Sequence, residues 1–501
     1  MNTHYITSAL PYVNGPPHLG HALELVLTDA LARWHRSAGR DVRYVTGSDE
    51  NSLKNVQAAE RAGVSVRELV DRNAAEFPRL AVALGVHIDD FVRTSVDPRH
   101  RATTEKLWQA CVDRGDVYKK KYRGLYCVGC EQFYAESELE AGCCPEHGTP
   151  PEVVEEENWF FRLSRYQEPL RELIARDALR VTPVERKNEV LRFVERGLED
   201  FSISRSRERA RGWGIAVPND PSQVVYVWFD ALGNYLAALG QAQASDAFER
   251  WWLRCPAREH VIGKGITRFH AVYWPAILLS AGLPLPTRVL VHGYVTVEGA
   301  KIGKSLGNAL DPFQLCDEYG SDALRYYLLR HLSTTKDGNF ERARLSQAHD
   351  SELANQLGNL LQRSLRLVEK RADGVVPKAE SALGAALSAA VSETARAVEA
   401  FDLRGALDAA WRFVAEVNRY ADETAPWQGE RDDTALYTLL DGAGAAAALL
   451  QPFLPKTAER IAERLGPRSV GAGARVGELR AGRRVSAGAP LFPRRVVASR
   501  R

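Results

Sequence analysis

Two histidines, His18 and His21, stand three residues apart near the start of the chain. This spacing places both imidazoles on one face of a helical turn. The first turn of a helix also presents unpaired N–H groups and the positive end of the helix dipole, which together attract phosphate. Imidazoles there can donate to oxygens that gain charge during nucleotidyl transfer. The alternatives are two half-buried residues that cap the helix, or a weak zinc site without a third nearby ligand.

Two lysines, Lys301 and Lys304, follow a strand-like stretch later in the chain and are separated by Ile-Gly. A loop that carries two ammonium groups can close on a polyphosphate and neutralise charge as pyrophosphate leaves. Most lysine pairs on loops are simply solvated. The lysine pair therefore gains meaning only in combination with the histidine pair.

A cysteine cluster lies between these two pairs. Cys127 and Cys130 form one pair with a two-residue gap, and Cys144 and His147 form another. Three thiolates and one imidazole make a closed tetrahedral site of the kind that holds structural zinc. Cys143 could replace Cys144, but the Cys144 pairing repeats the two-residue gap. We expect this zinc to support folding rather than catalysis, because no open coordination position is indicated.

The composition limits the classes of protein to consider. A length of 501 residues predicts several domains, and a net charge of +2 argues against a uniformly basic nucleic-acid clamp. The end of the chain from Lys456 is basic, and it could contact phosphates or remain solvated. No apolar run is long enough to span a bilayer, and no signal peptide is evident. Seven cysteines, four of them clustered, favour a metal site in a reducing cytoplasm.

The elements that must position these residues follow a recognisable order. A short strand from His4 ends at Pro11, a turn follows, and apolar residues recur at helical spacing from Leu19. A second strand ends in the acidic loop that contains Asp49. Strand–helix units stop near residue 116, resume near 226, and give way to helical patterns from about 352. We predict a doubly wound parallel α/β sheet, interrupted by an inserted module and followed by a helical bundle.

Taken together, several stretches resemble one family. "HLGH" and "KIGKS" resemble the two signatures of class I aminoacyl-tRNA synthetases. The resemblance narrows to methionyl-tRNA synthetases through "ALPYVNGPPHLGH", "YVWFDALGNY", "FHAVYWP", "SLGNALDPF" and "DALRYYLLR". The cysteine cluster fits the same family. The similarity runs from about Tyr5 to Phe492, nearly the whole chain.

The resemblance implies a Rossmann-like class I catalytic domain, split by a zinc-binding insertion and followed by an α-helical anticodon-binding bundle. The expected division places the two catalytic halves in residues 1–115 and 226–325, with the zinc-bearing insertion in 116–225. A stem-contact or linker region then covers 326–351, the anticodon-binding domain 352–475 and a basic segment 476–501.

The resemblance also implies a two-step reaction. Methionine attacks ATP, with Mg²⁺ accompanying the nucleotide, to give methionyl-adenylate and pyrophosphate, and the methionyl group then passes to the 3′ end of tRNA(Met). His18, His21, Lys301 and Lys304 would be the catalytic residues. The residues expected to bind ATP are these four together with Gly20 and Gly263.

An amino-acid pocket and an anticodon reader carry over in the same way. Asp49 would bind the substrate ammonium group through a charge-assisted contact. An aromatic apolar slot suits a thioether, although some of its residues could be ordinary core. The slot would comprise Leu10, Tyr12, Trp228, Ala231, Leu232, Tyr235, Phe269, His270 and Trp274. The anticodon would be read by Asn359, Arg363 and Trp427, with helix packing as the alternative role for Trp427.

The sequence departs from the family pattern at three places. Asn51 and Ser52 replace the usual His-Gly, and Gly265 replaces an aspartate expected to hold the ATP ribose. Such a lost hydrogen bond costs about 1–3 kcal/mol. Gly303 loosens the lysine loop and removes a hydroxyl, while both lysines survive.

These departures leave alternatives to a housekeeping ligase. The chain could be an inhibitor-resistant second copy, an amide-forming enzyme that uses an aminoacyl-adenylate, or a weakly catalytic tRNA-binding regulator. The presence of both histidines and Lys304 argues against the regulator, and the anticodon residues argue against the amide-forming enzyme. We expect a cytoplasmic protein that binds no DNA and no membrane. We also expect a monomer, because no dimerising module is evident.

Overall fold

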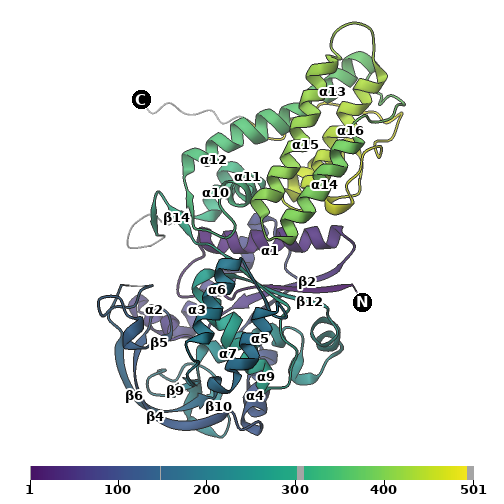
Figure 1. Ribbon diagram of the computed structural model, residues 1–501. Coiled ribbons are helices and arrows are strands. Elements are labelled where there is room, and N and C mark those ends of the chain that lie inside the picture. The colour runs from purple at the N-terminus through teal and green to yellow at the C-terminus, as the bar shows by residue number, and fades with distance from the viewer. Residues whose placement is uncertain (1, 147, 302–309, 494–501) are drawn as a thin grey trace, which may run out of the picture. The chain divides into compact units, whose positions relative to one another are not determined.

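The computed structural model describes residues 2–146, 148–301 and 310–493 (Figure 1). The chain forms two compact units. The first comprises the residues up to Pro17 together with Val42–Arg79 and Ile88–His292. The second comprises His18–Asp41, Leu80–His87 and the chain from Gly293 onward.

The strands and helices have the following bounds. The strands are β1 (Thr3–Ser8), β2 (Asp41–Ser48), β3 (Asp90–Arg93), β4 (Val117–Cys127), β5 (Gln132–Tyr134), β6 (Glu152–Phe161), β7 (Arg180–Thr182), β8 (Phe201–Ser202), β9 (Ser204–Ser206), β10 (Ala216–Val217), β11 (Asp220–Val225), β12 (Ala257–Gly263), β13 (Arg288–His292), β14 (Val295–Val297), β15 (Ala300–Lys301) and β16 (Gly338–Phe340). The α-helices are α1 (Leu19–Ser37), α2 (Leu53–Ala62), α3 (Val66–Leu84), α4 (Pro98–Asp113), α5 (Gln167–Ala175), α6 (Val184–Glu195), α7 (Val227–Ala237), α8 (Asp246–Phe248), α9 (Trp274–Ser280), α10 (Pro312–Tyr319), α11 (Ser321–Tyr326), α12 (Arg342–Ala348), α13 (Asn359–Ala372), α14 (Gly384–Glu399), α15 (Leu403–Thr424), α16 (Asp433–Leu450) and α17 (Pro455–Leu465).

The first unit is built on a parallel sheet with the strand order β3-β2-β1-β12-β13-β7. Every residue of β1 is buried, as expected for a strand covered on both faces. The chain leaves β1 for β2 on one side, while β12 pairs with β1 on the other. Ligands bind such sheets at this switch point, beyond the carboxyl ends of the strands. The predicted doubly wound α/β fold is confirmed, and the expected binding crevice lies where β1, β2 and β12 end.

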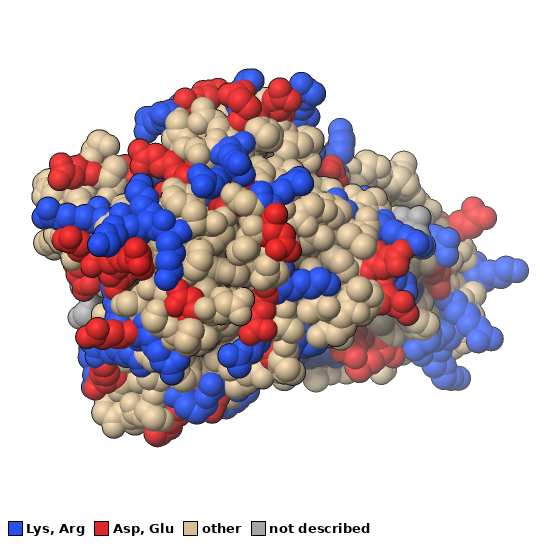
Figure 2. Space-filling model, turned by 90° about the horizontal axis from the view of Figure 1, so that it is seen from below, with Lys and Arg blue, Asp and Glu red and all other residues tan. Residues whose placement is uncertain are grey.

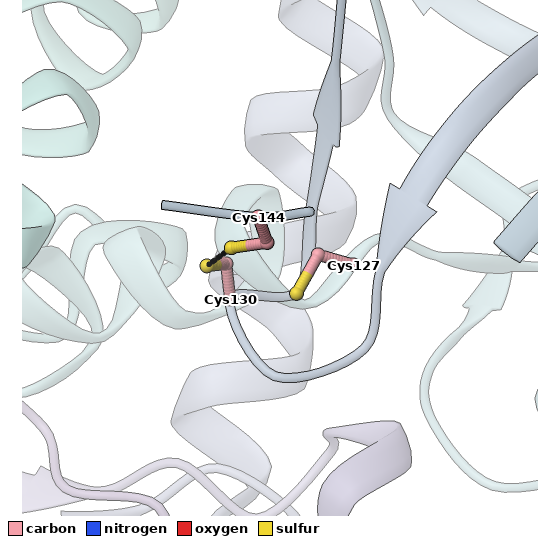
Figure 3. A group of neighbouring side chains, drawn as sticks. All are labelled: Cys127, Cys130 and Cys144. Carbon is pink, nitrogen blue, oxygen red and sulfur yellow. Dashed lines mark hydrogen bonds between the residues drawn. The ribbon is translucent and has the colours of Figure 1, made fainter. Parts of the chain in front are cut away.

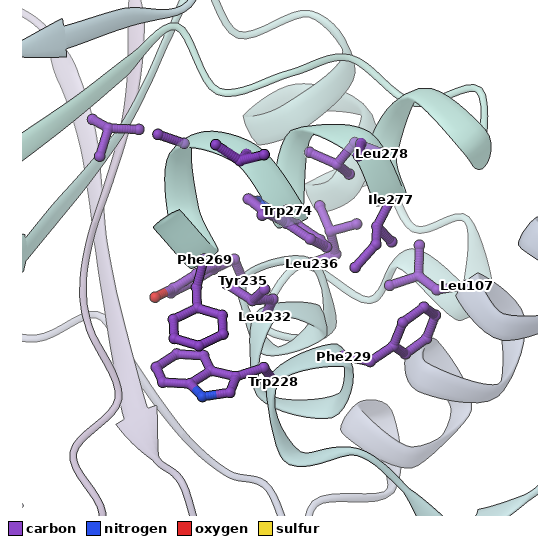
Figure 4. Close-up of a cluster of buried hydrophobic side chains, with 14 of the residues drawn as sticks. Leu107, Trp228, Phe229, Leu232, Tyr235, Leu236, Phe269, Trp274, Ile277 and Leu278 are labelled. Carbon is purple, nitrogen blue, oxygen red and sulfur yellow. The ribbon is translucent and has the colours of Figure 1, made fainter. Parts of the chain in front are cut away.

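Three helices of the first unit enclose a large apolar core beside the sheet (Figure 4). Every residue of α7 is buried, so this helix is an internal element rather than an amphipathic surface helix. Trp108 of α4 meets Phe229 of α7 edge to face at 5.5 Å between ring centres, a favourable aromatic geometry. Leu107 and Ile277 extend the cluster to α4 and α9. This packing holds α7, and hence Trp228, in a defined orientation.

The inserted region contains a long antiparallel hairpin of β4 and β6, flanked by β5 and β8. Basic residues of β4 face acidic residues of β6: Lys121 pairs with Glu157, and Arg123 with Glu155. Opposite charges directly across two strands stabilise the pairing. Basic and acidic side chains are interspersed over the face in Figure 2. The short strand β7, which also lies within residues 116–225, returns to the main sheet and pairs with β13.

The second unit is mainly helical, and α13 to α16 lie side by side (Figure 1). From Ala435 to Leu450 every residue of α16 is buried, so this helix forms the centre of the bundle. A side chain at Gly442 would come within 3.1 Å of both methyl groups of Val417, so glycine here allows α15 to pack closely on α16. None of the helices in the described parts of the chain is both long and apolar enough to cross a membrane.

A buried arginine, Arg325 of α11, joins three segments of the second unit. Its guanidinium lies 2.7 Å from Asp29 of α1, and both side chains are completely buried. It also donates to the backbone oxygens of Phe453, at 2.8 Å, and Pro452, at 3.2 Å. Arg33 provides Asp29 with a second cation at 2.8 Å. The pair therefore ties α1 to the segment between α16 and α17.

We predict that Arg325→Ala will destabilise the second unit strongly. Removing one partner of a buried ion pair costs about 3–5 kcal/mol, because the remaining charge is left without compensation. Arg419 pairs with Glu416 on the surface, and an exposed pair contributes about 0–1 kcal/mol, so Arg419→Ala is the matched control. Denaturant unfolding followed by circular dichroism would measure both. Equal midpoints for the two variants would contradict this role of Arg325.

Candidate active site

The loop that follows β2 places a buried carboxylate, that of Asp49, at the expected crevice. The Asp49 backbone N–H donates to the Pro11 oxygen at 2.9 Å, which joins this loop to the segment after β1. Asp49 is 2% exposed, and its Oδ1 has no hydrogen-bond partner among the described residues. Buried polar atoms are nearly always paired, so an unpaired carboxylate oxygen in a crevice indicates a place for a ligand.

The charges around Asp49 favour a cationic ligand. Burial raises the pKa of Asp49 well above its usual range, and the nearby carboxylates of Asp230 and Glu131 raise it further. The Lys54 ammonium opposes this effect, and its Nζ lies 4.3 Å from the centre of the Tyr12 ring. Carboxylates that repel one another are relieved by an added positive charge. An amino-acid ammonium group meets this requirement.

Asp230 is held by two polar residues of the first unit, Asn51 and His100. Its Oδ1 pairs with His100 Nε2, and its Oδ2 accepts from Asn51 at 2.7 Å. Asn51, one of the departures from the family pattern, therefore supports the loop through an amide hydrogen bond. Sequence reasoning missed Asp230 as a residue of the site. The only indication was that it follows Trp228, a predicted pocket residue, by two positions.

The aromatic residues of the expected slot lie beside the carboxylate, since Tyr12 pairs with Asp49 in an isolated β-bridge. Trp228 stacks on Phe269 with ring centres 3.8 Å apart and planes inclined by 8° (Figure 4). The Tyr12 ring meets Trp228 edge to face at 6.3 Å. Neither the Tyr12 hydroxyl nor Trp228 Nε1 has a partner among the described side chains and backbone. Aromatic rings of this kind favour contact with an apolar, polarizable side chain, and the two unpaired groups can form hydrogen bonds beside it.

His270 is uncharged in this slot. Its Nε2 accepts from the Tyr235 hydroxyl at 2.8 Å, and its Nδ1 lies 3.0 Å from the Ile266 oxygen, to which it donates as a neutral ring. Burial lowers the pKa of His270 to about 4. His270 therefore carries no charge that would compete with a substrate ammonium group at neutral pH.

The structure brings the remaining predicted pocket residues into the same part of the first unit. Tyr235 lies against both His270 and Trp274. Ala231 and Leu232 are buried on α7, and Leu10 is partly buried after β1. Tyr235, Trp274 and Leu232 belong to the same large apolar core as Trp228 and Phe269.

The histidine pair lies at the N-terminal end of α1, in the second unit. His18 is the N-cap, and its Nδ1 accepts from the Gly20 N–H at 3.1 Å. His21 Nδ1 accepts from the His18 N–H at 3.1 Å, and the two rings stack at 3.8 Å. A side chain at Gly20 would lie 3.0 Å from His18 Cε1, so glycine makes room for this arrangement.

The protonation of these rings suits phosphate oxygens. Because each Nδ1 accepts a backbone hydrogen bond, the neutral tautomer carries its proton on Nε2. Burial, together with the neighbouring His18, lowers the pKa of His21 well below its usual value. His21 is therefore a neutral N–H donor at the positive end of α1.

The other predicted nucleotide residues lie only partly within the described chain. Gly263 ends β12 at the switch point, and the exposed Gly265 follows it in a short 3₁₀ turn. Lys301 ends β15. Lys304 and Gly303 lie outside the described residues.

Three cysteine thiols of the cluster converge on one point (Figure 3). The sulfurs of Cys127, Cys130 and Cys144 all lie within 4.8 Å of one another, and those of Cys130 and Cys144 are 3.3 Å apart. Burial raises the pKa of Cys130, and the Tyr134 hydroxyl donates to its sulfur at 3.0 Å. Three thiols at this spacing, two of them buried and that of Cys130 partly buried, fit a metal ion that would stabilise them as thiolates. His147 lies outside the described residues.

The predicted anticodon residues lie on the helical bundle of the second unit. Asn359 begins α13, and Arg363 follows one turn later. The Arg363 guanidinium lies 5.3 Å from the centre of the Trp427 ring and 3.4 Å from Asp422. Trp427 is 41% exposed, unusual for so large an apolar side chain. An exposed indole beside a guanidinium can stack on an unpaired base.

The chain matches known proteins over nearly its whole length. The sequence model of the class I tRNA synthetases (M) matches residues 4–149 and 144–365. The methionine–tRNA ligase of Brucella suis biovar 1 is 42% identical over 99% of this chain and 98% of its own length. That of Thermotoga maritima is 41% identical, over 92% of this chain and 75% of its own length. The Mycobacterium tuberculosis methionyl-tRNA synthetase bound by methionyl-adenylate superposes with a TM-score of 0.91, at 39% identity, over 98% of this chain and 100% of that chain.

The fold and the site together define a class I tRNA synthetase. Within that class, the chain belongs to the methionine–tRNA ligase family. The relatives named here give no support to the amide-forming or regulatory alternatives.

The raised pKa of Asp49 predicts a pH dependence of amino-acid binding. An ammonium ligand needs the ionised carboxylate, so affinity should fall with decreasing pH as Asp49 is protonated, at a higher pH than for an ordinary aspartate of pKa about 3.9. Asp49→Asn should abolish this dependence and weaken binding about 10–100-fold, the effect of a charge-assisted hydrogen bond of about 1.5–3 kcal/mol. Isothermal titration calorimetry at several pH values would measure both.

The matched control is Asp220→Asn, since hydrogen bonds from Lys119, Ser222 and Trp159 outweigh burial and lower the pKa of Asp220 to about 2. That variant should keep the wild-type profile. A wild-type affinity that does not change with pH would show that Asp49 does not bind the ammonium group.

Proposed function

We propose that this chain activates methionine with ATP and then transfers the methionyl group to tRNA(Met). The observation that carries this proposal is the buried Asp49 carboxylate, whose Oδ1 has no hydrogen-bond partner among the described residues, beside the stacked Trp228 and Phe269 rings. The carboxylate suits an ammonium group, and the slot suits a thioether. The similarity to a synthetase bound to methionyl-adenylate supports the same substrate.

The first step requires positioning and charge stabilisation rather than a covalent enzyme intermediate. Asp49 holds the ammonium group, so that the methionine carboxylate can attack the α-phosphorus. Gly20 and Gly263 lie close to the nucleotide in this proposal. His18 and His21 donate from Nε2 to phosphate oxygens, and Lys301 and Lys304 neutralise the departing pyrophosphate. Mg²⁺ accompanies the nucleotide and shares this neutralisation when bound.

ATP–pyrophosphate exchange across a panel of amino acids is the direct test. We expect exchange with methionine alone, and a fall of about 10²–10³-fold in kcat for His21→Ala, because one preorganised donor to the transition state is lost. His35→Ala, at the other end of α1, is the matched control and should retain exchange. Absence of exchange with every amino acid, in folded protein, would overturn the ligase proposal.

The helical bundle supplies the second recognition event in this proposal. Asn359, Arg363 and Trp427 read the anticodon, and the exposed indole provides a stacking surface. Residues 352–475 would then act as the tRNA-reading domain, and residues 1–115 and 226–325 as the catalytic domain. In Trp427→Ala, aminoacylation of tRNA(Met) should fall while pyrophosphate exchange is unchanged, which separates the two steps.

Zinc is the metal that best suits the cysteine cluster. Cys127, Cys130, Cys144 and His147 provide the four ligands of a structural site, whose contribution is to folding. All seven cysteines are free, which is consistent with a reducing compartment such as the cytoplasm.

The zinc proposal predicts about one metal ion per chain. Cys130→Ser should lose most of this metal and lower the melting temperature, because a ligand that holds the knuckle is removed. Cys255→Ser, which changes a buried thiol outside the cluster, should retain it. Elemental analysis and thermal unfolding provide the readouts. Full metal content in Cys130→Ser would exclude Cys130 as a ligand.

A further inference from the structure

Glu131 is a buried acidic residue that the proposed reaction does not use. It follows Cys130 directly and is 0% exposed. Its φ of 54° lies in the left-handed region, which side chains other than glycine rarely adopt. A backbone conformation of this kind persists only where the surrounding structure holds it, and such residues are common at functional sites.

One carboxylate oxygen of Glu131 caps the helix that follows the Asp49 loop. Its Oε1 accepts from the backbone N–H of Lys54 at 3.2 Å. Lys54 is the second residue of α2, so this N–H has no partner within the helix. A negative charge at a helix start is also favoured by the helix dipole. The contact therefore fixes the start of α2, four residues after Asp49.

The backbone of Glu131 holds the element that carries the aromatic slot. The Tyr226 hydroxyl, buried in the same core, donates to the Glu131 backbone oxygen. Tyr226 is the N-cap residue of α7, and Trp228 stands two positions further along. One residue thus contacts both the segment that presents the carboxylate and the segment that presents the indole.

The remaining contacts of Glu131 balance its charge. Its Oε2 accepts from Arg205 Nη2 at 3.1 Å and from the Tyr126 hydroxyl. Arg205 also donates to the Tyr126 hydroxyl at 3.1 Å. A buried charge is tolerated when it is paired and hydrogen-bonded in this way. A purely structural ion pair would make the same contacts. The experiment must therefore separate a structural role of Glu131 from a role in positioning the pocket.

We propose that Glu131 is a positioning residue for the methionine pocket: it sets the distance between the Asp49 loop and Trp228 by holding α2 and α7 at once. This inference rests on the proposed assignment of that pocket to methionine. It predicts that loss of the carboxylate weakens methionine binding selectively, while ATP binding is preserved.

Two substitutions test the carboxylate. Glu131→Ala removes all its side-chain contacts and should raise the KM and Kd for methionine by tenfold or more, with little change in the KM for ATP. Glu131→Gln keeps an oxygen that can accept from the Lys54 N–H, so it should restore part of the affinity. Pyrophosphate exchange and calorimetry supply the values, and metal content and melting temperature establish that the variants are folded.

Tyr226→Phe provides a second route, because it removes the hydroxyl on the Glu131 oxygen and leaves the carboxylate intact. It should weaken methionine binding severalfold. The matched control is Asp116→Asn, another buried carboxylate of the first unit, which accepts from Arg165, Tyr166 and Ser280. That variant loses contacts of the same kind but should bind methionine as the wild type does.

The pH profile of methionine binding reports a separate effect of Glu131, that of its charge on Asp49. The charged groups facing Asp49 are Asp230, itself paired with His100, together with Glu131 and Lys54. Glu131→Gln removes one of the two carboxylates that raise the pKa of Asp49. The fall in affinity with decreasing pH should therefore shift to lower pH in this variant.

Each outcome has a distinct meaning. Wild-type methionine affinity in folded Glu131→Ala would overturn the positioning role, and so would an equal loss of methionine and ATP affinity in both Glu131 variants and in Tyr226→Phe. If Asp49→Asn loses methionine binding while the Glu131 variants keep it, only this inference fails. If Asp49→Asn keeps it, the assignment of the pocket fails first.

Discussion

The parallel pairing of β1 with β12 is the constraint on which the site depends. These strands lie some 250 residues apart in the chain, yet they are neighbours from His4 opposite Ala257 to Ser8 opposite Val261. The chain that connects them includes β2 and β3 of the same sheet and the inserted region, and it must return to the sheet at β12. The pairing creates the switch point, with Tyr12 beyond β1, Asp49 beyond β2 and Phe269 shortly after β12. Because main-chain hydrogen bonds fix this register, the crevice is formed before any ligand arrives.

The chemistry of the crevice comes from a balance between buried charge and neutral rings. Asp49 keeps an unpaired oxygen in a setting where two other carboxylates make a bound cation favourable. Burial holds His270 neutral, although its hydrogen bond to the Ile266 oxygen acts in the opposite direction, so the ring shapes the slot without adding charge. The free energy of burying unpaired polar atoms is offset when substrate binds, which is how a site can be less stable alone and still selective.

The inserted region contributes more than a metal knuckle. Its hairpin carries the converging thiols, and the residue next to them, Glu131, contacts α2 and the residue that caps α7. Asn51, one of the departures from the family pattern, donates its side-chain amide to Asp230. In the second unit, the buried ion pair of Arg325 and the close packing at Gly442 hold the helices together.

Local patterns along the chain were sufficient to predict the alternating strands and helices, the helix start at His18, the clustering of the closely spaced cysteines and the helical end region. These features depend on periodicity, capping and fixed spacing between neighbours, which the order of residues carries directly. The resemblance of its motifs to those of a known family supplied the pocket residues and the reaction. The Asp230–His100 pair, the Glu131 contacts and the return of β7 to the main sheet were not predictable in this way. Each joins residues far apart in the chain, and which distant groups meet in a buried, low-dielectric interior depends on the packing of the whole domain.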